Sequence, residues 1–478
     1  MLIRTALCGA LAWAASAAAQ CVPPPADRFV GVGPTGQDIE SFATALSRDG
    51  TCMAGSIAHA PASGTNYSAT SFRWTQAGGL VLIPTLAGDW TSYPTAVNTD
   101  GSLIIGASSP FQSPLHGWRY TQGQVESIVQ VPQNGVPYAL TPDDSTMVGE
   151  AAYCTWRIVN NGPLDCVNSV SAGRAVSADG TVIVGGPYRW SATDGLTYVP
   201  YAVMWDVSAD GARSVGGREY PFYDACWWDA AGTARPIQSS GNGSTASAMA
   251  CDDAGTLIAG YGPNGAFVNT DAMGTLDLAT VLSLQGADLS GWTLEYARAV
   301  SADGSVLAGV GTHNGLHEAW MATLGVLLAT QPEDRAVCGG ASVSFTATAV
   351  GGPLSWSWVK DGAPLVPDDR VRVEPSADGR SCTLVFITTI GSDSRSYRCA
   401  VSDGCTSIAG SVFHLYASTA DFNGDGDVGT DADIAAFFAC LAGSCCPTCG
   451  SADFNGDGDI GTDQDIESFF RVLAGGPC

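Results

Sequence analysis

Short apolar runs separated by turn residues recur along the first two-thirds of the chain. Runs such as 182–184 and 306–308 are unalternated and rich in branched residues, which is typical of short strands buried on both faces. An Asp-Gly dipeptide stands just before each of these runs, as at Asp179-Gly180. Asp-Gly favours a tight turn because glycine adopts positive φ and the aspartate can accept hydrogen bonds from nearby backbone N–H groups. Aromatic segments such as 72–74 and 188–190 follow and predict a neighbouring strand.

These features belong to an internal repeat with about seven copies. The copies at 175–185 and 299–309 are the clearest, and related copies begin near residues 45, 96, 139, 207 and 248, about 42 residues apart on average. Units of ~40–45 residues with several strands each are typical of propeller blades. We therefore expect residues 21–328 to form a β-propeller of about seven blades, with six to eight left open by the uneven spacing.

The repeat resembles the HAF family of bacterial extracellular repeat proteins. The resemblance is carried by 289–294, 299–309 and 318–320 and extends over about residues 40–325. It implies export and a repeated β-fold, and it implies no catalytic residue. The Ser-x-Asp-Gly-Thr segment also resembles the Asp-box of sialidase-type propellers, but the tryptophan expected after the threonine is replaced, for example by Val182. We interpret this segment as a structural turn.

The pattern changes after Leu328 to alternating segments such as 342–348 and 382–386, which predict antiparallel strands. Trp358 precedes Val-Lys-Asp-Gly, and Tyr397 stands two residues before Cys399. These features resemble I-set immunoglobulin-like domains, in which such a tryptophan lies in the core and such a tyrosine forms the tyrosine corner. The resemblance implies a β-sandwich over residues 331–417. No cysteine is present near Thr346, where the usual partner of Cys399 would lie. Four cysteines allow three pairings, of which we expect Cys338–Cys405 with Cys382–Cys399.

Two near-copies of an acidic segment, 421–434 and 453–466, close the chain, and each leads into an apolar run. The pattern D-x-N-x-D-G matches the first half of an EF-hand calcium loop. Side-chain oxygens at positions 1, 3 and 5 and a backbone carbonyl at position 7 are the ligands of such a loop. The candidate calcium ligands, with one closing carboxylate in each loop, are Asp421, Asn423, Asp425, Asp427, Asp431, Asp453, Asn455, Asp457, Asp459 and Asp463.

The duplication resembles a type I dockerin module over residues 419–478. That resemblance implies a small α-helical EF-hand unit, calcium as the cofactor, and docking to a cohesin-like or cell-surface protein partner. The chain departs from the pattern at position 12, where Ala432 and Gln464 replace the closing carboxylate. A loop shortened by one residue would let Asp431 and Asp463 close the site, and Asp433 and Asp465 stay open as alternatives.

Composition narrows the functional classes. The chain has 46 acidic and 20 basic residues and a net charge of −26, so it would be repelled by phosphate backbones and we expect no nucleic-acid partner. Residues 1–20 combine Arg4, an apolar run and an A-x-A site, which predicts a secretory signal peptide. No later stretch approaches the ~20 apolar residues of a transmembrane helix. We therefore expect a secreted or cell-surface protein.

Sixteen cysteines fit the oxidising compartment that export implies. We expect Cys154–Cys166 and Cys226–Cys251 to be disulfides and Cys52 to be a free thiol. In the tail, the spacing Cys445-Cys446-x-x-Cys449 also occurs in zinc sites, but no histidine is present there, so we expect disulfides instead.

The sequence contains no nucleophile elbow, zinc-protease motif, P-loop or dinucleotide fingerprint. We therefore expect a non-catalytic binding or adhesion protein, with a repeat propeller for ligand or glycan binding and a calcium-stabilised docking tail. The alternative is a carbohydrate-active enzyme, a glycoside hydrolase or polysaccharide lyase, with its active site on the propeller. The sequence does not decide whether the protein is an enzyme.

Overall fold

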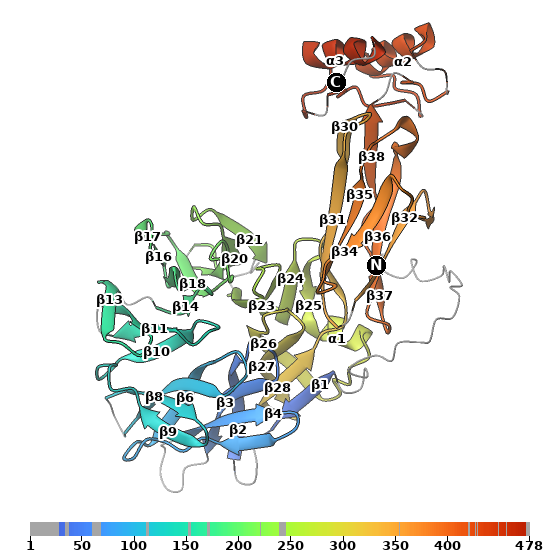
Figure 1. Ribbon diagram of the computed structural model, residues 1–478. Coiled ribbons are helices and arrows are strands. Elements are labelled where there is room, and N and C mark those ends of the chain that lie inside the picture. The colour runs from blue at the N-terminus through green and yellow to red at the C-terminus, as the bar shows by residue number, and fades with distance from the viewer. Residues whose placement is uncertain are drawn as a thin grey trace.

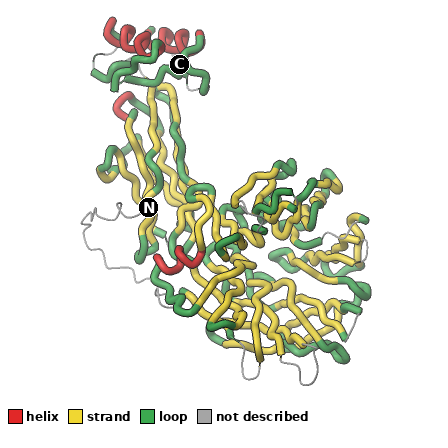
Figure 2. Tube along the Cα trace, turned by 180° about the vertical axis from the view of Figure 1, so that it is seen from behind, coloured by secondary structure: helices red, strands yellow, loops and turns green. Residues whose placement is uncertain are grey.

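The structure is a computed structural model with three parts in chain order: a large repeat region, a sandwich and a small helical tail (Figure 1). It describes residues 28–33, 38–59, 68–110, 114–151, 154–169, 173–219, 221–238, 245–352, 354–418, 421–425, 427, 429–447, 449–455 and 457–474. The predicted signal peptide, 1–20, lies outside these residues. The sandwich stands between the repeat region and the tail, so the molecule is elongated (Figures 1 and 2).

Each repeat forms one four-stranded antiparallel sheet whose strands pair in chain order. The first three sheets are β2(Asp38–Leu46), β3(Cys52–His59), β4(Ser68–Thr75) and β5(Gly79–Leu82), then β6(Thr91–Val97), β7(Leu103–Ser109), β8(His116–Thr121) and β9(Gln124–Ser127), then β10(Val136–Leu140), β11(Thr146–Ala151), β12(Cys154–Val159) and β13(Leu164–Asn168). The next three are β14(Ala175–Val176), β15(Val182–Gly185), β16(Tyr188–Ser191) and β17(Gly195–Tyr198), then β18(Ala202–Val207), β19(Ser214–Arg218), β20(Ala225–Trp228) and β21(Ala234–Gln238), then β22(Ser247–Cys251), β23(Leu257–Gly262), β24(Gly265–Thr270) and β25(Gly274–Asp277).

The seventh sheet takes strands from both ends of the repeat region. It contains β26(Trp292–Val300), β27(Val306–His313) and β28(Leu316–Thr323), and the early strand β1(Phe29–Val32) pairs with β28. The short helix α1(Leu278–Leu284) precedes it and is capped by Asp277, whose side chain accepts from the Thr280 N–H. The fold therefore joins residues near 30 to residues near 320 in one sheet.

The Asp-Gly turns are structural, as expected. In the fourth sheet the Ser177 hydroxyl donates to Asp179 Oδ1 at 2.7 Å, and the Val182 N–H donates to Ser177 Oγ at 2.9 Å. Gly180 takes a φ of 72°, which a residue with a side chain rarely adopts. Backbone hydrogen bonds between these turns connect neighbouring sheets, and one of them joins the Ala302 N–H to the Arg48 carbonyl at 2.8 Å.

The expected fold class requires correction. The described strands form nine separate sheets, eight with four strands and one with six, and none of these sheets is closed. The β-propeller of about seven blades is therefore not the fold class that these findings support, whereas the mainly β character holds. The repeat pattern predicts the strands within one copy, because turn residues and apolar runs are local signals. It does not determine how the copies assemble, because their ladders of hydrogen bonds end within each sheet.

The sandwich has two sheets. One has the order β29(Leu327–Thr330), β31(Val343–Val350), β35(Ser381–Phe386) and β34(Val371–Pro375). The other has the order β30(Arg335–Cys338), β38(Phe413–Ser418), β36(Arg395–Ser402), β32(Ser355–Lys360) and β33(Ala363–Pro364), with β37(Ser407–Ala409) beside β36 and a 3-10 turn, η2(Gly391–Asp393), before β36. Buried aromatic and aliphatic residues from both sheets fill the space between them.

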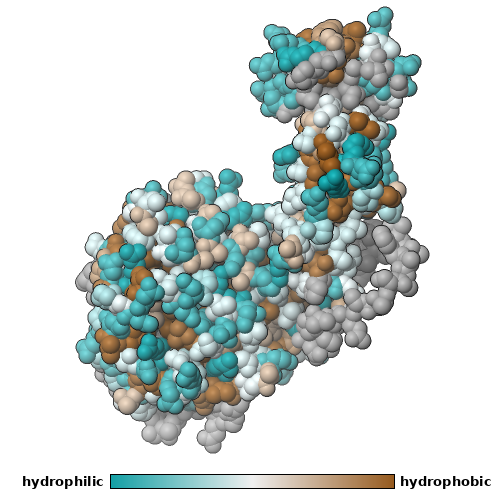
Figure 3. Space-filling view, in the orientation of Figure 1, coloured by the Kyte–Doolittle hydropathy of each residue, from teal (hydrophilic) through white to brown (hydrophobic). Residues whose placement is uncertain are grey.

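The tail contains two helices of equal length, α2(Asp431–Leu441) and α3(Asp463–Leu473). Four fully buried phenylalanines, Phe422, Phe437, Phe454 and Phe469, form its core. The rings of Phe437 and Phe469 stack at 4.0 Å, so the two helices pack through equivalent residues of the two copies. Figure 3 shows the tail as a small body at the far end of the sandwich from the repeat region.

Candidate metal centre

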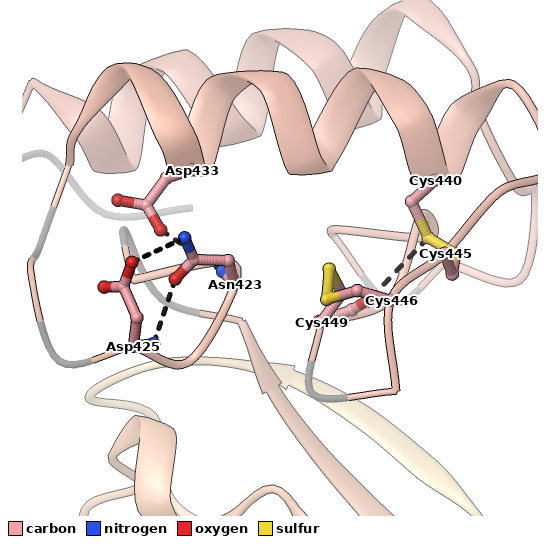
Figure 4. Close-up of a disulfide and its surroundings, with 8 residues drawn as sticks. Asn423, Asp425, Asp433, Cys440, Cys445, Cys446 and Cys449 are labelled. Carbon is pink, nitrogen blue, oxygen red and sulfur yellow. Dashed lines mark hydrogen bonds between the residues drawn. A yellow bond between two sulfur atoms is a disulfide. The ribbon is translucent and has the colours of Figure 1, made fainter.

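The first acidic loop is held by hydrogen bonds among its own candidate ligands (Figure 4). The Asp425 N–H donates to Asn423 Oδ1 at 2.9 Å, and Asn423 Nδ2 donates to Asp425 Oδ2 at 2.8 Å. The Asp427 N–H donates to Asp425 Oδ1 at 2.9 Å. The loop therefore brings Asn423 and Asp425 together as the EF-hand pattern predicts.

The second loop repeats this arrangement and adds contacts of its first ligand. Asp453 accepts from the N–H groups of Asp457 and Gly458, at 3.1 and 3.0 Å. Asn455 Nδ2 donates to Asp457 Oδ2 at 2.7 Å. The Asp459 N–H, and after it the Asn455 side chain, donate to the exposed Asp457 carboxylate. These hydrogen bonds favour the charged form and lower the pKa of Asp457.

The carboxylates that face the loops are Asp433 and Asp465. Asp433 Oδ2 accepts from the Thr430 N–H at 2.8 Å, and its Oδ1 accepts from the Asn423 N–H at 3.2 Å. Asp465 makes the equivalent contacts, with the Phe454 N–H at 2.7 Å and the Thr462 N–H at 2.8 Å. Both side chains are fully buried. Each therefore ties the start of a helix to the front of its own loop.

Asp431 and Asp463 are exposed at the first position of α2 and α3. The structure thus directs the open alternatives, rather than the expected pair, toward the loops. The sequence contains a signal for the orientation of Asp433 and Asp465. Thr430-x-x-Asp433 and Thr462-x-x-Asp465 are capping boxes, in which the side chain of the third helical residue accepts from the backbone N–H of the N-cap.

Burial alone would raise the pKa of Asp433, but the N–H groups of Thr430 and Asn423 outweigh that effect and the pKa lies below its ordinary value. The carboxyl is therefore an anion near neutral pH. An anionic carboxylate held at the closing side of each loop suits the hard oxygen ligands that calcium prefers.

The arrangement of the described side chains shows how far a metal site is already formed. Within the described stretches of the tail and elsewhere, no three histidine, cysteine, aspartate or glutamate side chains converge as a preformed metal site. Each loop instead offers carboxylates together with an asparagine and a backbone carbonyl. The residues at 426, 428 and 456 lie outside the described residues. The donor chemistry fits calcium.

The cysteines beside the loops form disulfides, which confirms that expectation against zinc. Cys440 pairs with Cys445 and Cys446 with Cys449, between the two loop–helix copies (Figure 4). In the repeat region Cys154 pairs with Cys166 as expected. The expected pair Cys226–Cys251 is wrong, because both residues are buried free thiols. Cys52 is free, as expected.

The sandwich core confirms the features expected of an immunoglobulin-like domain. Trp358 is buried between the sheets, and the Tyr397 hydroxyl donates to the Asp393 carbonyl at 2.9 Å. Cys405 is disulfide-bonded, whereas the side chain of Cys338 lies outside the described residues. The expected pair Cys382–Cys399 is wrong, since both are free, and Trp358 Nε1 donates to Cys382 Sγ at 3.3 Å.

Buried polar contacts join the sandwich to the repeat region. Arg28 and Asp403 form an ion pair at 2.9 Å, and their side chains are 2% and 3% exposed. Asp403 also accepts from the Val326 N–H, and the Thr270 hydroxyl donates to the Leu328 carbonyl at 2.9 Å. No local pattern predicts this pair, because its partners are 375 residues apart.

Residues 327–412 match the family model described as the immunoglobulin I-set domain. This part of the chain is an immunoglobulin-like domain. The match ends short of the tail and leaves out almost all of the repeat region.

Similar solved structures include an I-band fragment of titin (I67–I69), with 19% identity, a TM-score of 0.18, and coverage of 20% of this chain and 32% of that one. Domain D1 of Duf (Kirre) has 20% identity, a TM-score of 0.18, and coverage of 19% and 94%. The titin M3 domain has 23% identity, a TM-score of 0.18, and coverage of 20% and 96%. No curated protein matches the chain.

The helices of the described residues include none long and apolar enough to cross a membrane. The immunoglobulin-like domain fits a non-enzymatic binding or adhesion role and an extracellular setting, since such domains typically mediate protein–protein binding.

Proposed function

We propose that this is an exported, non-catalytic binding protein whose tail is a calcium-stabilised docking module. The observation that carries the proposal is the duplicated loop and helix, in which Asp433 and Asp465 are buried and bonded to both ends of their loops. The resemblance of the tail to dockerins and of the repeats to the HAF family supports the same conclusion. The predicted signal peptide supports export.

In this proposal Asp421, Asn423, Asp425 and the Asp427 carbonyl hold one calcium ion, and Asp453, Asn455, Asp457 and the Asp459 carbonyl hold a second. Asp433 and Asp465 close the loops in place of Asp431 and Asp463, because they face them. When bound, calcium would neutralise carboxylates that otherwise repel one another across a short loop. The chain's own contribution is to restrain several of these side chains through backbone N–H groups, as at Asp433 and Asp453.

A calcium titration of the full-length protein tests the proposal. We expect heat on binding, and loss of that heat in a variant carrying both Asp425→Asn and Asp457→Asn. A variant with Asp361→Asn and Asp368→Asn in the immunoglobulin-like domain removes the same charge and should titrate like the parent. Absence of calcium-dependent heat from the parent, or equal titration of both variants, would overturn the metal assignment.

The partner of the tail would be a cohesin-like or cell-surface protein. Phe438 and Phe470 occupy equivalent positions on α2 and α3, and they are 43% and 44% exposed with their rings 6.2 Å apart. Large apolar side chains exposed together suit a protein interface. Replacement of both by serine should abolish retention on a cell surface that retains the parent.

The enzyme alternative finds little support among the described carboxylates. Inverting and retaining glycosidases need two free carboxyl groups ~5–10 Å apart. In the cavity lined by the first strands of the repeat sheets, Asp206 accepts from the Cys251 and Val207 N–H groups, and Asp253 is paired with Arg48. Release of soluble sugars from polysaccharides by the full-length protein would favour the alternative.

A further inference from the structure

One position of the repeat varies while its neighbours stay alike. This position lies six residues before the glycine of the Asp-Gly turn. In the third copy, Asp144 stands in place of that glycine. The residues there are Thr44, Thr95, Tyr138, Arg174, Trp205, Met249 and Arg298. The turn itself keeps the same hydrogen bonds from copy to copy, as in the Ser47–Asp49 and Ser301–Asp303 pairs.

All of these variable residues line one cavity of about 400 Å³. The cavity is lined by the first strand of each sheet in the repeat region, from β2 to β26. In six of the seven strands the variable residue is the one at which the pairing register shifts, as between Ala43 and Ala45 or between Ala297 and Ala299. The seventh, Arg174, directly precedes β14. Bulges of this kind re-aim a side chain and are common beside binding sites.

The close packing behind the cavity explains why the bulges are uniform. A Cβ on Gly309 would lie 2.0 Å from the Tyr296 carbonyl oxygen, and one on Gly260 would lie 2.1 Å from that of Ser247. The glycine of the second strand thus admits the bulged first strand. The fold supplies one equivalent, inward-facing position per repeat, and the sequence fills each with different chemistry.

Among the described residues, the charges in the cavity leave one cation without a partner. Arg48 is paired with Asp253, and Arg174 donates to Glu150 at 3.0 Å. Asp252 accepts from the Thr256 and Leu257 N–H groups. Asp206 accepts from two backbone N–H groups, and burial raises its pKa to about 6. Every acid on the wall is therefore already bonded.

Arg298 differs from these groups. Its guanidinium lies over the Tyr296 ring at 5.1 Å, and its Nε is buried without a hydrogen-bond partner among the described residues. A buried guanidinium N–H without an acceptor is costly unless a ligand satisfies it. Such a group favours a planar carboxylate, which it can bind through two parallel hydrogen bonds.

Flat and hydroxyl-bearing groups complete the wall. The Arg174 guanidinium lies over Tyr138 at 4.0 Å and 5.7 Å from the Trp205 ring centre. Thr44 and Thr95 place hydroxyls on the same layer, and Thr95 donates to the Pro137 carbonyl at 2.6 Å. Aromatic rings beside a few polar groups, in a cavity within the ~300–1,000 Å³ of ligand pockets, suit a small polar ring.

We propose that this cavity binds a carboxylated sugar, with its carboxylate on Arg298 and its ring near Trp205 and Tyr138. The inference names the ligand class for the binding half of the proposed function, and it is independent of the calcium-binding tail. A free sugar acid and the acidic unit at the end of a polysaccharide present the same chemistry to this wall.

Calorimetry on the full-length protein tests the assignment, with D-glucuronate and D-glucose as probes and an oligogalacturonide as the chain-end form. We expect glucuronate to bind at least ten times more tightly than glucose. Arg298→Gln should weaken glucuronate at least tenfold and leave glucose unchanged, whereas Arg298→Lys should fall between. The matched control is Arg157→Gln, which removes an outer arginine paired with Asp165.

Equal affinity for glucuronate and glucose, equal behaviour of Arg298→Gln and Arg157→Gln, or no binding of any probe would each overturn the inference. Benzoate that binds as well as glucuronate would overturn the sugar assignment. If Arg298→Gln does not fold, Trp205→Ala serves in its place and should weaken glucuronate at least fivefold. Each titration is repeated with a calcium chelator, and unchanged glucuronate affinity separates this site from the tail.

Discussion

A single residue of difference in spacing decides which acid closes each tail loop. The motif places its closing ligand at Ala432, and the neighbours Asp431 and Asp433 are equal candidates in sequence alone. The helix decides between them: Asp431 points to solvent at the first helical position, whereas Asp433 completes a capping box with Thr430. Capping geometry, which is a local backbone property, therefore selects the carboxylate that faces the loop.

This selection predicts unequal effects of matched substitutions. Asp433→Asn should lower calcium affinity at least tenfold and destabilise the tail by about 1 kcal/mol, because it weakens an N-terminal cap as well. Asp431→Asn should change both by much less, since the side chain is exposed. Calcium titration and thermal melting of the two full-length variants provide the measurement. A larger loss of affinity in Asp431→Asn would return the closing role to Asp431.

The buried ion pair between Arg28 and Asp403 makes a second prediction. Asp403→Ala leaves a buried guanidinium whose Nε and Nη1 have no hydrogen-bond partner within the described part of the chain, so it should cost about 3–5 kcal/mol of stability. Arg395→Ala, which breaks an exposed pair with Asp361, should cost about 0–1 kcal/mol. Urea unfolding followed by tryptophan fluorescence compares the two variants.

The same pair gives the pH dependence its sign. Burial raises the pKa of Asp403, but hydrogen bonds from the Thr406 N–H and Arg28 lower it by more. The net result is a pKa of about 2 in the folded protein. An unfolded aspartate titrates near ~3.9. A depressed folded pKa contributes stability above the unfolded value, and that contribution is lost as the pH falls from about 4 to 2. The free energy of unfolding should therefore fall less between about pH 4 and pH 2 in Asp403→Ala than in the parent. The same fall in both proteins would contradict the argument.

The repeat sheets show how glycine and bulge depend on each other. In the second strand of a sheet, a glycine lies under the bulged carbonyl of the first strand and against a ring of the third, as Gly309 does with Tyr296 and Trp320. The same contacts recur at Gly106, with the Tyr93 carbonyl and the Trp118 ring. The second-strand glycine is therefore a packing requirement, separate from the turn glycine, which is required by its φ.

Gly309→Ala should therefore destabilise the repeat region by about 1–3 kcal/mol, because the new Cβ meets backbone that cannot move away. Gly274→Ala supplies the control: no atom lies within 4 Å of its Cβ position, and only its φ of 68° opposes the change. That strain should cost about 1 kcal/mol. Differential scanning calorimetry of both variants measures the difference, and equal melting temperatures would contradict the packing argument.

Strands, turns and the sandwich core could be predicted from the sequence because they depend on local signals. Apolar runs, Asp-Gly turns, Trp358 and Tyr397 all lie where those signals placed them. The expected disulfides Cys226–Cys251 and Cys382–Cys399 were wrong, because pairing depends on which sheets face each other and all four thiols are free. The cavity was missed for a related reason: Arg298 looks like a variable surface position in the sequence, and only the structure shows that it and its six equivalents line one cavity.

The arrangement of the three parts depends on contacts that no local pattern reveals. Arg28 at the start of the described chain reaches the immunoglobulin-like domain, and Arg380 of that domain pairs with Asp303 in the last repeat turn. The backbone adds Ala272 N–H to the Ala329 carbonyl at 3.0 Å. A joint with two ion pairs and shared backbone bonds should behave as one body, so the immunoglobulin-like domain should keep a fixed direction relative to the repeat region.

This rigidity can be measured by small-angle X-ray scattering of the full-length protein. We expect a single elongated shape for the parent, because the joint buries both partners of the ion pair between Arg28 and Asp403. Gly325 and Gly351 lie at this joint, but each is packed closely against other atoms and is therefore a poor hinge. Arg380→Ala combined with Asp403→Asn should broaden the distance distribution, since only apolar packing and a few hydrogen bonds then hold the joint. Arg370→Ala combined with Asp361→Asn removes charges within the immunoglobulin-like domain and should leave the distribution unchanged. A parent that already samples many orientations would mean that the buried pair stabilises the domain without setting its direction, and the tail would then dock independently of the cavity.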